Sequence, residues 1–193
     1  MEDGLNIFGS DIHNDISVDR DIVSWFDKIA QNTMSEYAII GSYALHQYIP
    51  DKVKYNDIDV MVRMMDKRRI RNWFDVSDVV YNKVNNFRIN VPFINNYLDI
   101  KFFEVDSLLW IVEEAVPMFE DRDSGRFATK EGLLYLYLMS TDDKHVEHIN
   151  LLLDETDVNV VYVFEKLKLY DRYKSIDKLE TILKDKGIYY ETI

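Results

Sequence analysis

The sequence predicts an α+β fold: a small mixed β-sheet with flanking helices, followed by an α-helical lobe. Two patterns support this prediction. Between residues 37 and 103, short apolar runs alternate with turn residues, as expected for buried strands. After residue 106, apolar residues recur at helical spacing. We therefore expect an α/β lobe over residues 1–105 and a helical lobe over residues 106–193, packed against each other with a cleft between them.

The elements follow in order along the N-terminal half. The first 16 residues are rich in Asp and Asn and predict an arm or loop. Ser17 can cap a helix with Ile22, Phe26 and Ile29 on one face. Strands are expected at 37–40, 57–62, 76–81, 87–91 and 97–103, and short helices at 44–48 and 67–74. Asparagine pairs at 85–86 and 95–96 predict turns between strands.

The C-terminal half contains helical patterns throughout. Apolar positions spaced three or four apart predict helices within 108–115, 133–138, 146–153, 160–167 and 176–183. The boundary near residue 105 has no Gly-, Pro- or Ser-rich linker, which favours two lobes in direct contact.

Composition excludes several classes of protein. The 193 residues carry 23 basic and 35 acidic side chains, a net charge of −12, which argues against a general nucleic-acid coat protein. Without cysteine there is no disulfide scaffold, zinc ribbon or thiol nucleophile. We find no secretory leader and no apolar run of membrane length. We therefore expect a soluble cytoplasmic protein, in the host cytoplasm if the source is viral, with no membrane partner.

Three aspartates form the most informative pattern. Asp57 and Asp59 alternate with apolar residues, so a strand would present both carboxylates on one face. Asp99 lies in a second strand with the same alternation. Adjacent carboxylates repel each other unless a cation lies between them, and Mg²⁺ prefers oxygen ligands. If the two strands are neighbours, the three carboxylates could hold two Mg²⁺ ions, with Mn²⁺ as an alternative.

Gly41 and Ser42 form the second half of the expected site. A glycine at the end of a strand lets the backbone approach a phosphate, and the following helix offers free N–H groups to an anion. The Ser42 hydroxyl can donate a hydrogen bond to a phosphate oxygen. Ser42 is a poor candidate for a covalent nucleophile, because only His46 lies nearby as a base.

This arrangement resembles the nucleotidyltransferase superfamily, which includes DNA polymerase beta, CCA-adding enzymes and aminoglycoside nucleotidyltransferases. The similarity spans about residues 37–103 and is greatest to minimal AbiEii-like members. It is carried by the segments Ile-Ile-Gly-Ser-Tyr-Ala-Leu at 39–45, Asn-Asp-Ile-Asp-Val at 56–60 and Leu-Asp-Ile at 98–100. The helical half resembles these proteins only loosely.

The resemblance implies an enzyme that moves a nucleoside monophosphate from an NTP, ATP among them, to a hydroxyl and releases pyrophosphate. Asp57, Asp59 and Asp99 would be the catalytic metal ligands. The nucleotide-binding residues would be Gly41, Ser42, Lys101 and Lys130. The acceptor stays open between RNA, tRNA-like in particular, a protein and a small molecule. The alternative is a non-catalytic module with the same fold that binds a host or partner protein.

Other charged groups have competing interpretations. Residues 52–71 carry seven basic and three acidic side chains, which indicates either a rim that steers anions or a solvated helix face. Lys101 could neutralise phosphate or pair with an acid. His145 and His148 lie three apart, and with no third ligand evident we expect a half-exposed pair rather than a metal site.

Overall fold

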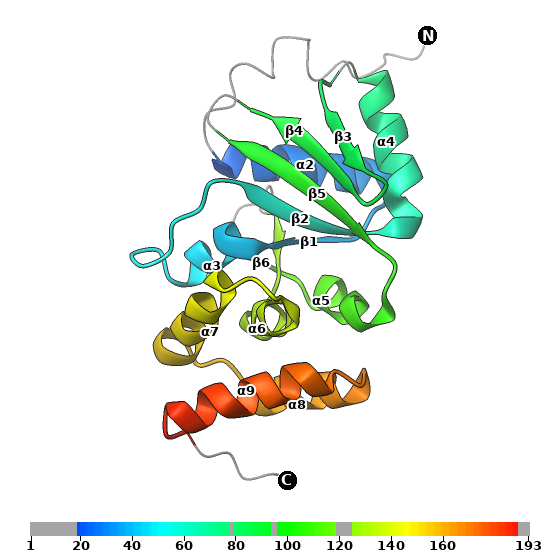
Figure 1. The fold of residues 1–193 in the computed structure, drawn as a ribbon. Helices are drawn as coiled ribbons and strands as arrows, with labels where there is room; N and C mark the ends of the chain where they lie inside the picture. Colours follow the sequence, from blue (N-terminus) through cyan, green and yellow to red (C-terminus); the bar gives the residue numbers. More distant parts are fainter. Residues whose placement is uncertain (1–18, 78, 94–95, 119–124, 189–193) are drawn as a thin grey trace.

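The computed structural model describes residues 19–77, 79–93, 96–118 and 125–188. Its strands form a seven-stranded sheet of order β3-β4-β5-β2-β1-β7-β6 (Figure 1). The strands are β1 Tyr37–Ile40, β2 Ile58–Arg63, β3 Asn82–Asn85, β4 Arg88–Pro92, β5 Tyr97–Phe103, β6 Val116–Pro117 and β7 Arg126–Phe127.

Eight α-helices are described around this sheet. They are α2 Asp19–Thr33, α3 Gly41–Tyr48, α4 Lys67–Val76, α5 Leu109–Glu113, α6 Lys130–Met139, α7 Lys144–Glu155, α8 Val160–Leu169 and α9 Tyr173–Asp185. Short 3₁₀ turns, Met64–Asp66 and Asp106–Leu108, follow β2 and β5. The α+β class is confirmed. The C-terminal half is mostly helical as expected, but it also contributes the two-residue strands β6 and β7 to the sheet.

Strand register explains how distant residues meet. β1 pairs antiparallel with β2, while β2 pairs parallel with β5, so the sheet is mixed as expected. In the second pairing Asp59 is the direct partner of Asp99. Residues 40 positions apart in sequence therefore lie side by side on adjacent strands.

Alternation along the strands defines two faces of the sheet. Ile58 and Val60 of β2 and Leu98 and Ile100 of β5 point to one face, and all four are fully buried. Helix α2 lies behind β4 and β5 in Figure 1, and it packs against α4. Trp25 of α2 forms an edge-to-face contact with Phe93 just beyond β4, with ring centroids 5.5 Å apart.

The opposite face carries the aspartates and is only partly covered. Helix α5 packs against β1 and β2, and α3 packs against β2. Helix α6 lies between the sheet and the layer formed by α8 and α9, and it contacts α3, α7, α8 and α9 (Figure 1). The helical lobe is thus built around α6, whose start is capped by a hydrogen bond from the Gly132 amide to the Thr129 side chain.

One predicted strand is wrong. Residues 76–81 were expected to be extended, but α4 continues to Val76 and the strand that follows, β3, begins at Asn82. The helix persists because Ile70 and Phe74 are one helical turn apart and both are buried. The adjacent asparagine turn at 85–86 is confirmed between β3 and β4.

Some expectations remain untested. The N-terminal arm, the Ser17 cap and the turn at Asn95 lie outside the described residues. The boundary near residue 105 stays a prediction, and β6 and β7, which come after it, pair with the sheet. Among the helices that are described, none has the length and apolar character required to cross a membrane.

Candidate active site

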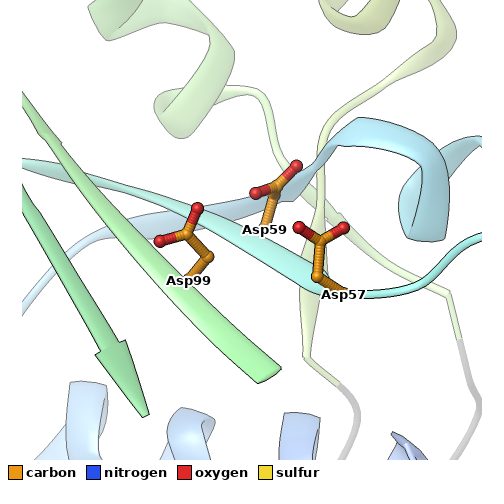
Figure 2. A group of neighbouring side chains, drawn as sticks. All are labelled: Asp57, Asp59 and Asp99. Atoms are coloured by element: carbon orange, nitrogen blue, oxygen red, sulfur yellow. The ribbon is translucent and has the colours of Figure 1, made fainter. Parts of the chain in front are cut away.

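Three carboxylates converge on the partly covered face of the sheet. One oxygen from each of Asp57, Asp59 and Asp99 lies within 4.8 Å of the others, and Figure 2 shows all three side chains on the same side. Asp57 immediately precedes β2, Asp59 is its second residue, and Asp99 is the third residue of β5. The parallel pairing of β2 with β5 therefore assembles the predicted cluster.

Two of the three clustered carboxylates are largely buried, which makes their negative charges costly. The Asp99 side chain is 1% exposed and that of Asp59 is 15% exposed. Oδ1 of Asp59 and Oδ2 of Asp99 are buried, and neither accepts a hydrogen bond from the residues that the structure describes. Burial raises the pKa of Asp59, and the charges of Asp57 and Asp99 raise it further, while Lys101 opposes them. The cluster therefore favours a cation.

Two basic side chains already face these carboxylates. The Lys101 ammonium lies 2.7 Å from Asp59 Oδ1 and 3.7 Å from Asp99 Oδ2. Arg88 of β4 donates from Nε to Asp99 Oδ1 at 2.6 Å, and this hydrogen bond raises the pKa of Arg88. Asp99 is left with Oδ2 as its unoccupied oxygen.

Gly41 brings the start of α3 against Asp59. Its φ of +70° lies in the left-handed region that favours glycine. A Cβ at this position would lie 2.4 Å from Asp59 Oδ2, so only a residue without a side chain fits beside the carboxylate. The predicted glycine turn and the predicted acidic strand are therefore in direct contact.

Tyr137 connects the helical lobe to the same turn. Its hydroxyl donates a hydrogen bond of 2.9 Å to the Gly41 carbonyl oxygen. Burial raises the pKa of Tyr137, and the Asp59 charge acts in the same direction. His145 stacks on the Tyr137 ring at 4.9 Å, and His148 lies at 5.1 Å from it. The two histidines are half-buried and pack behind the site.

The other two predicted contact residues, Ser42 and Lys130, lie at the starts of two different helices. Ser42 lies in the first turn of α3, partly exposed. Lys130 is the first residue of α6, and its ammonium pairs with Asp157 in the connection between α7 and α8. This ion pair lowers the pKa of Asp157. Because Asp157 is almost fully exposed, the pair is weak.

Much of the basic segment 52–71 serves local structure. Lys52 pairs with Glu155 at 2.5 Å and Arg63 with Glu36 at 2.9 Å. Arg69 pairs with Asp66, and Lys67 donates to the Asn86 carbonyl. These contacts support the interpretation of the segment as a solvated, internally paired surface.

A hollow of about 300 Å³ lies at the other end of β2 and β5. It is lined by Arg63, Met64, Met65, Phe103, Glu104, Val105, Asp106 and Leu109, and none of the three clustered aspartates contributes to it.

Sequence reasoning missed two residues of the site. Arg88 was read only as part of a strand, although alternation within 87–91 could have placed it with Asn90 on the polar face. Tyr137 lies within the helical pattern at 133–138, and no sequence signal links it to Gly41, 96 residues away. Both contacts depend on how separate elements pack.

The donor set fits a hard divalent cation. Three carboxylates supply oxygen ligands, and two of their buried oxygens lack hydrogen-bond partners. Mg²⁺ and Mn²⁺ prefer such oxygen-rich sites over sites built from nitrogen or sulfur. The residues present therefore suit the ions that the sequence resemblance implies.

The fold of this chain is similar to that of solved nucleotidyltransferase structures. A crystal structure of ANT(2″)-Ia in complex with adenylyl-2″-tobramycin matches with a TM-score of 0.51 and 15% identity, over 79% of this chain and 99% of that one. A solution structure of the antibiotic-resistance factor ANT(2″)-Ia matches with a TM-score of 0.51 and 14% identity, over 85% of this chain and 99% of that one. At these identities the similarity concerns the fold. No family model and no curated protein matches the sequence.

Proposed function

We propose that this protein is a metal-dependent nucleotidyltransferase, which moves an NMP from an NTP to a hydroxyl group and releases pyrophosphate. The observation that carries the proposal is the contact between the Gly41 turn and the three-aspartate cluster. A phosphate-binding turn and a metal-binding carboxylate cluster must lie together for this reaction, and here Gly41 lies directly against Asp59.

The turn would hold the triphosphate. Helix α3 begins after Ile40, whose side chain cannot cap the helix, so its first N–H groups are suited to phosphate oxygens. Gly41 and Ser42 would bind the β and γ phosphates, with Lys101 and Lys130 as further cations around the nucleotide. Tyr137 would hold the turn in place through its hydrogen bond to the Gly41 carbonyl.

Asp57, Asp59 and Asp99 would hold the Mg²⁺ or Mn²⁺ ions, which supply charge neutralisation at the phosphates and lower the pKa of a bound hydroxyl. The acceptor oxygen forms a bond to the α phosphorus while the bond from that phosphorus to the bridging oxygen breaks. Pyrophosphate leaves with the electron pair. Asp99 Oδ2, the oxygen that Arg88 does not contact, would take part in removing the hydroxyl proton. Positioning and charge neutralisation would account for most of the rate.

The acceptor classes implied by the sequence are RNA, a protein and a small molecule. One of the solved structures that shares the fold contains adenylyl-2″-tobramycin, a nucleotidylated small molecule, which supports transfer to a hydroxyl in general. We expect the reaction in the cytoplasm, where NTPs are available.

A thermal shift assay tests the proposal. Wild type and Asp57→Ala are measured with each of the four NTPs, with and without Mg²⁺. A ligand at 100 times its Kd adds about 2.7 kcal/mol to the stability of the folded state, or roughly 5–10 °C in Tm for a chain of this size. We expect a Mg²⁺-dependent shift that Asp57→Ala loses. If no NTP shifts wild type under either condition, the catalytic proposal is wrong and the binding-module alternative is favoured.

A further inference from the structure

Lys101 contacts two of the three clustered aspartates at once. Its ammonium lies 2.7 Å from Oδ1 of Asp59 and 3.7 Å from Oδ2 of Asp99. Lys101 follows Asp99 by two residues on β5, so the two side chains share a face, and the parallel pairing of β2 with β5 puts Asp59 directly beside Asp99. The register of the sheet therefore fixes the ammonium against both carboxylates.

The two oxygens that Lys101 contacts are those for which the cluster offers little else. Oδ1 of Asp59 and Oδ2 of Asp99 are buried and receive no hydrogen bond from the described residues, so the ammonium is their nearest compensation. Oδ1 of Asp99 is already bound by Arg88, and Oδ2 of Asp59 lies toward the Gly41 turn. A divalent cation bound by these carboxylates would therefore draw on oxygens that Lys101 holds.

Charge balance makes Lys101 a counter-ion of the cluster. The three aspartates against Lys101 and Arg88 leave a formal charge of −1, and without Lys101 the charge would be −2. Like charges this close together in a partly buried site repel each other, so each neutralising cation stabilises the cluster. Binding of a divalent cation and retention of the ammonium would supply the same neutralisation, and each therefore disfavours the other.

Lys101 is also able to leave its partners. Its side chain is 41% exposed, its contact with Asp99 is long, and a lysine ammonium sits on a flexible stem that can turn to another anion. Such an anion would be close by, because the Gly41 turn, which we propose holds the triphosphate, lies directly against Asp59. Phosphate oxygens would then offer Lys101 an alternative to the carboxylates.

We propose that Lys101 competes with the divalent cation for Asp59 and Asp99, and that it releases them when its ammonium transfers to the phosphates of a bound NTP. This inference rests on the proposed function and adds an order of assembly to it. Without nucleotide, the protein binds the metal weakly. Nucleotide and metal then strengthen each other's binding through Lys101.

Binding of Mn²⁺ in the absence of nucleotide tests the competition. Free Mn²⁺ is measured by electron paramagnetic resonance during titration of wild type, Lys101→Met and Lys101→Arg at pH 8. Methionine keeps most of the side-chain length without the charge, whereas arginine keeps the charge. The matched control is Lys83→Met, because Lys83 is exposed on β3 and pairs with Ile89, which lies on the face opposite Asp99. Tm shows whether each variant is folded, and Lys101→Gln replaces Lys101→Met if that variant is not.

We expect Lys101→Met to bind Mn²⁺ about tenfold or more tightly than wild type, because the metal no longer has to displace a cation. Lys101→Arg and Lys83→Met should both stay within about threefold of wild type. Equal affinities of wild type and Lys101→Met would overturn the proposal. An equal gain in Lys83→Met would also overturn it, because the effect would then follow from the overall charge of the chain.

Thermal shifts with NTP separate this failure from a failure of the proposed function. In wild type, Mg²⁺ and NTP together should raise Tm by more than the sum of their separate shifts, and this excess should shrink in Lys101→Met. An excess of the same size in Lys101→Met would overturn the transfer of Lys101 to the phosphates. If no NTP shifts wild type, the proposed function is wrong, whereas the Mn²⁺ affinities still decide whether Lys101 competes with the metal.

Discussion

The hydroxyl of Tyr137 donates a 2.9 Å hydrogen bond to the carbonyl oxygen of Gly41, and thereby ties the helical lobe to the turn beside Asp59. Tyr137 is buried in the last turn of α6, with His145 and His148 packed on its ring. A displacement of α6 would therefore be transmitted to the residues that we propose bind phosphate. Four predictions follow from this and the neighbouring contacts.

Tyr137→Phe should weaken both stability and nucleotide binding. The substitution removes one buried hydrogen bond, which costs about 1 kcal/mol and lowers Tm by roughly 2–4 °C. The Mg²⁺-dependent shift with NTP should also shrink, because the Gly41 turn loses its support. Tyr162→Phe is the control, since the Tyr162 hydroxyl binds the partly exposed Glu114 instead. Identical effects of the two substitutions on NTP binding would contradict this role for Tyr137.

Gly41→Ala should be more harmful than Gly187→Ala. Both glycines have positive φ, +70° and +67°, so alanine costs each about 1–2 kcal/mol through the backbone. At Gly187 a Cβ would meet nothing within 4 Å, whereas at Gly41 it would meet the Asp59 carboxylate. Urea unfolding of both variants measures the backbone cost, and Mg²⁺ titration with NTP measures the effect of the contact with the Asp59 carboxylate. We expect Gly41→Ala alone to lose metal-dependent NTP binding, and retention of that binding would show that Asp59 can move without cost.

Arg88→Ala should destabilise the fold through Asp99. Removing the partner of a buried carboxylate costs about 1–3 kcal/mol, and the partial exposure of Arg88 favours the lower half of that range. Arg63→Ala, which breaks an exposed pair with Glu36, should cost less than about 1 kcal/mol. A double-mutant cycle with Asp99→Asn, followed by urea unfolding, measures the coupling. If the effects of the two substitutions on the free energy of unfolding are additive, the Arg88–Asp99 pair contributes nothing to stability.

The histidine pair should make stability fall in mild acid. Burial lowers the pKa of His145 and of His148 below the ordinary value of 6.5. The Nδ1 atom of each ring is buried and has no hydrogen-bond partner within the described part of the chain. Their neutral forms therefore stabilise the fold fully above pH 6.5. Below it the unfolded chain binds protons more readily, so stability is lost as pH falls through the lowered pKa values.

Tm measured between pH 7.5 and pH 5.5 tests this effect, using wild type and the double variant His145→Gln/His148→Gln. The glutamines cannot take up a proton, so the decrease in Tm across this range should become smaller. An unchanged decrease in the double variant would assign the pH dependence to other groups.

Local pattern was sufficient for several elements of the fold. The apolar run at 37–40 was predicted with the limits that β1 has, and the strand at 97–103 matches β5. The predicted strand at 76–81 was wrong. The prediction relied on the high strand preference of valines such as Val76, but Val76 is the last residue of α4, which is held helical by the packing of Ile70 and Phe74. Tertiary burial overrode local propensity at that point.

Sequence by itself determined that Asp57 and Asp59 share a face, because side chains two residues apart on a strand point the same way. It also placed a glycine where the chain leaves a strand for a helix. Only the tertiary structure decided that β5 pairs in parallel with β2, which makes Asp99 the neighbour of Asp59. The same packing brought Arg88 to Asp99 and Tyr137 to Gly41. Alternation is a property of the local backbone, whereas strand partners and helix contacts depend on how the whole chain buries its apolar surface.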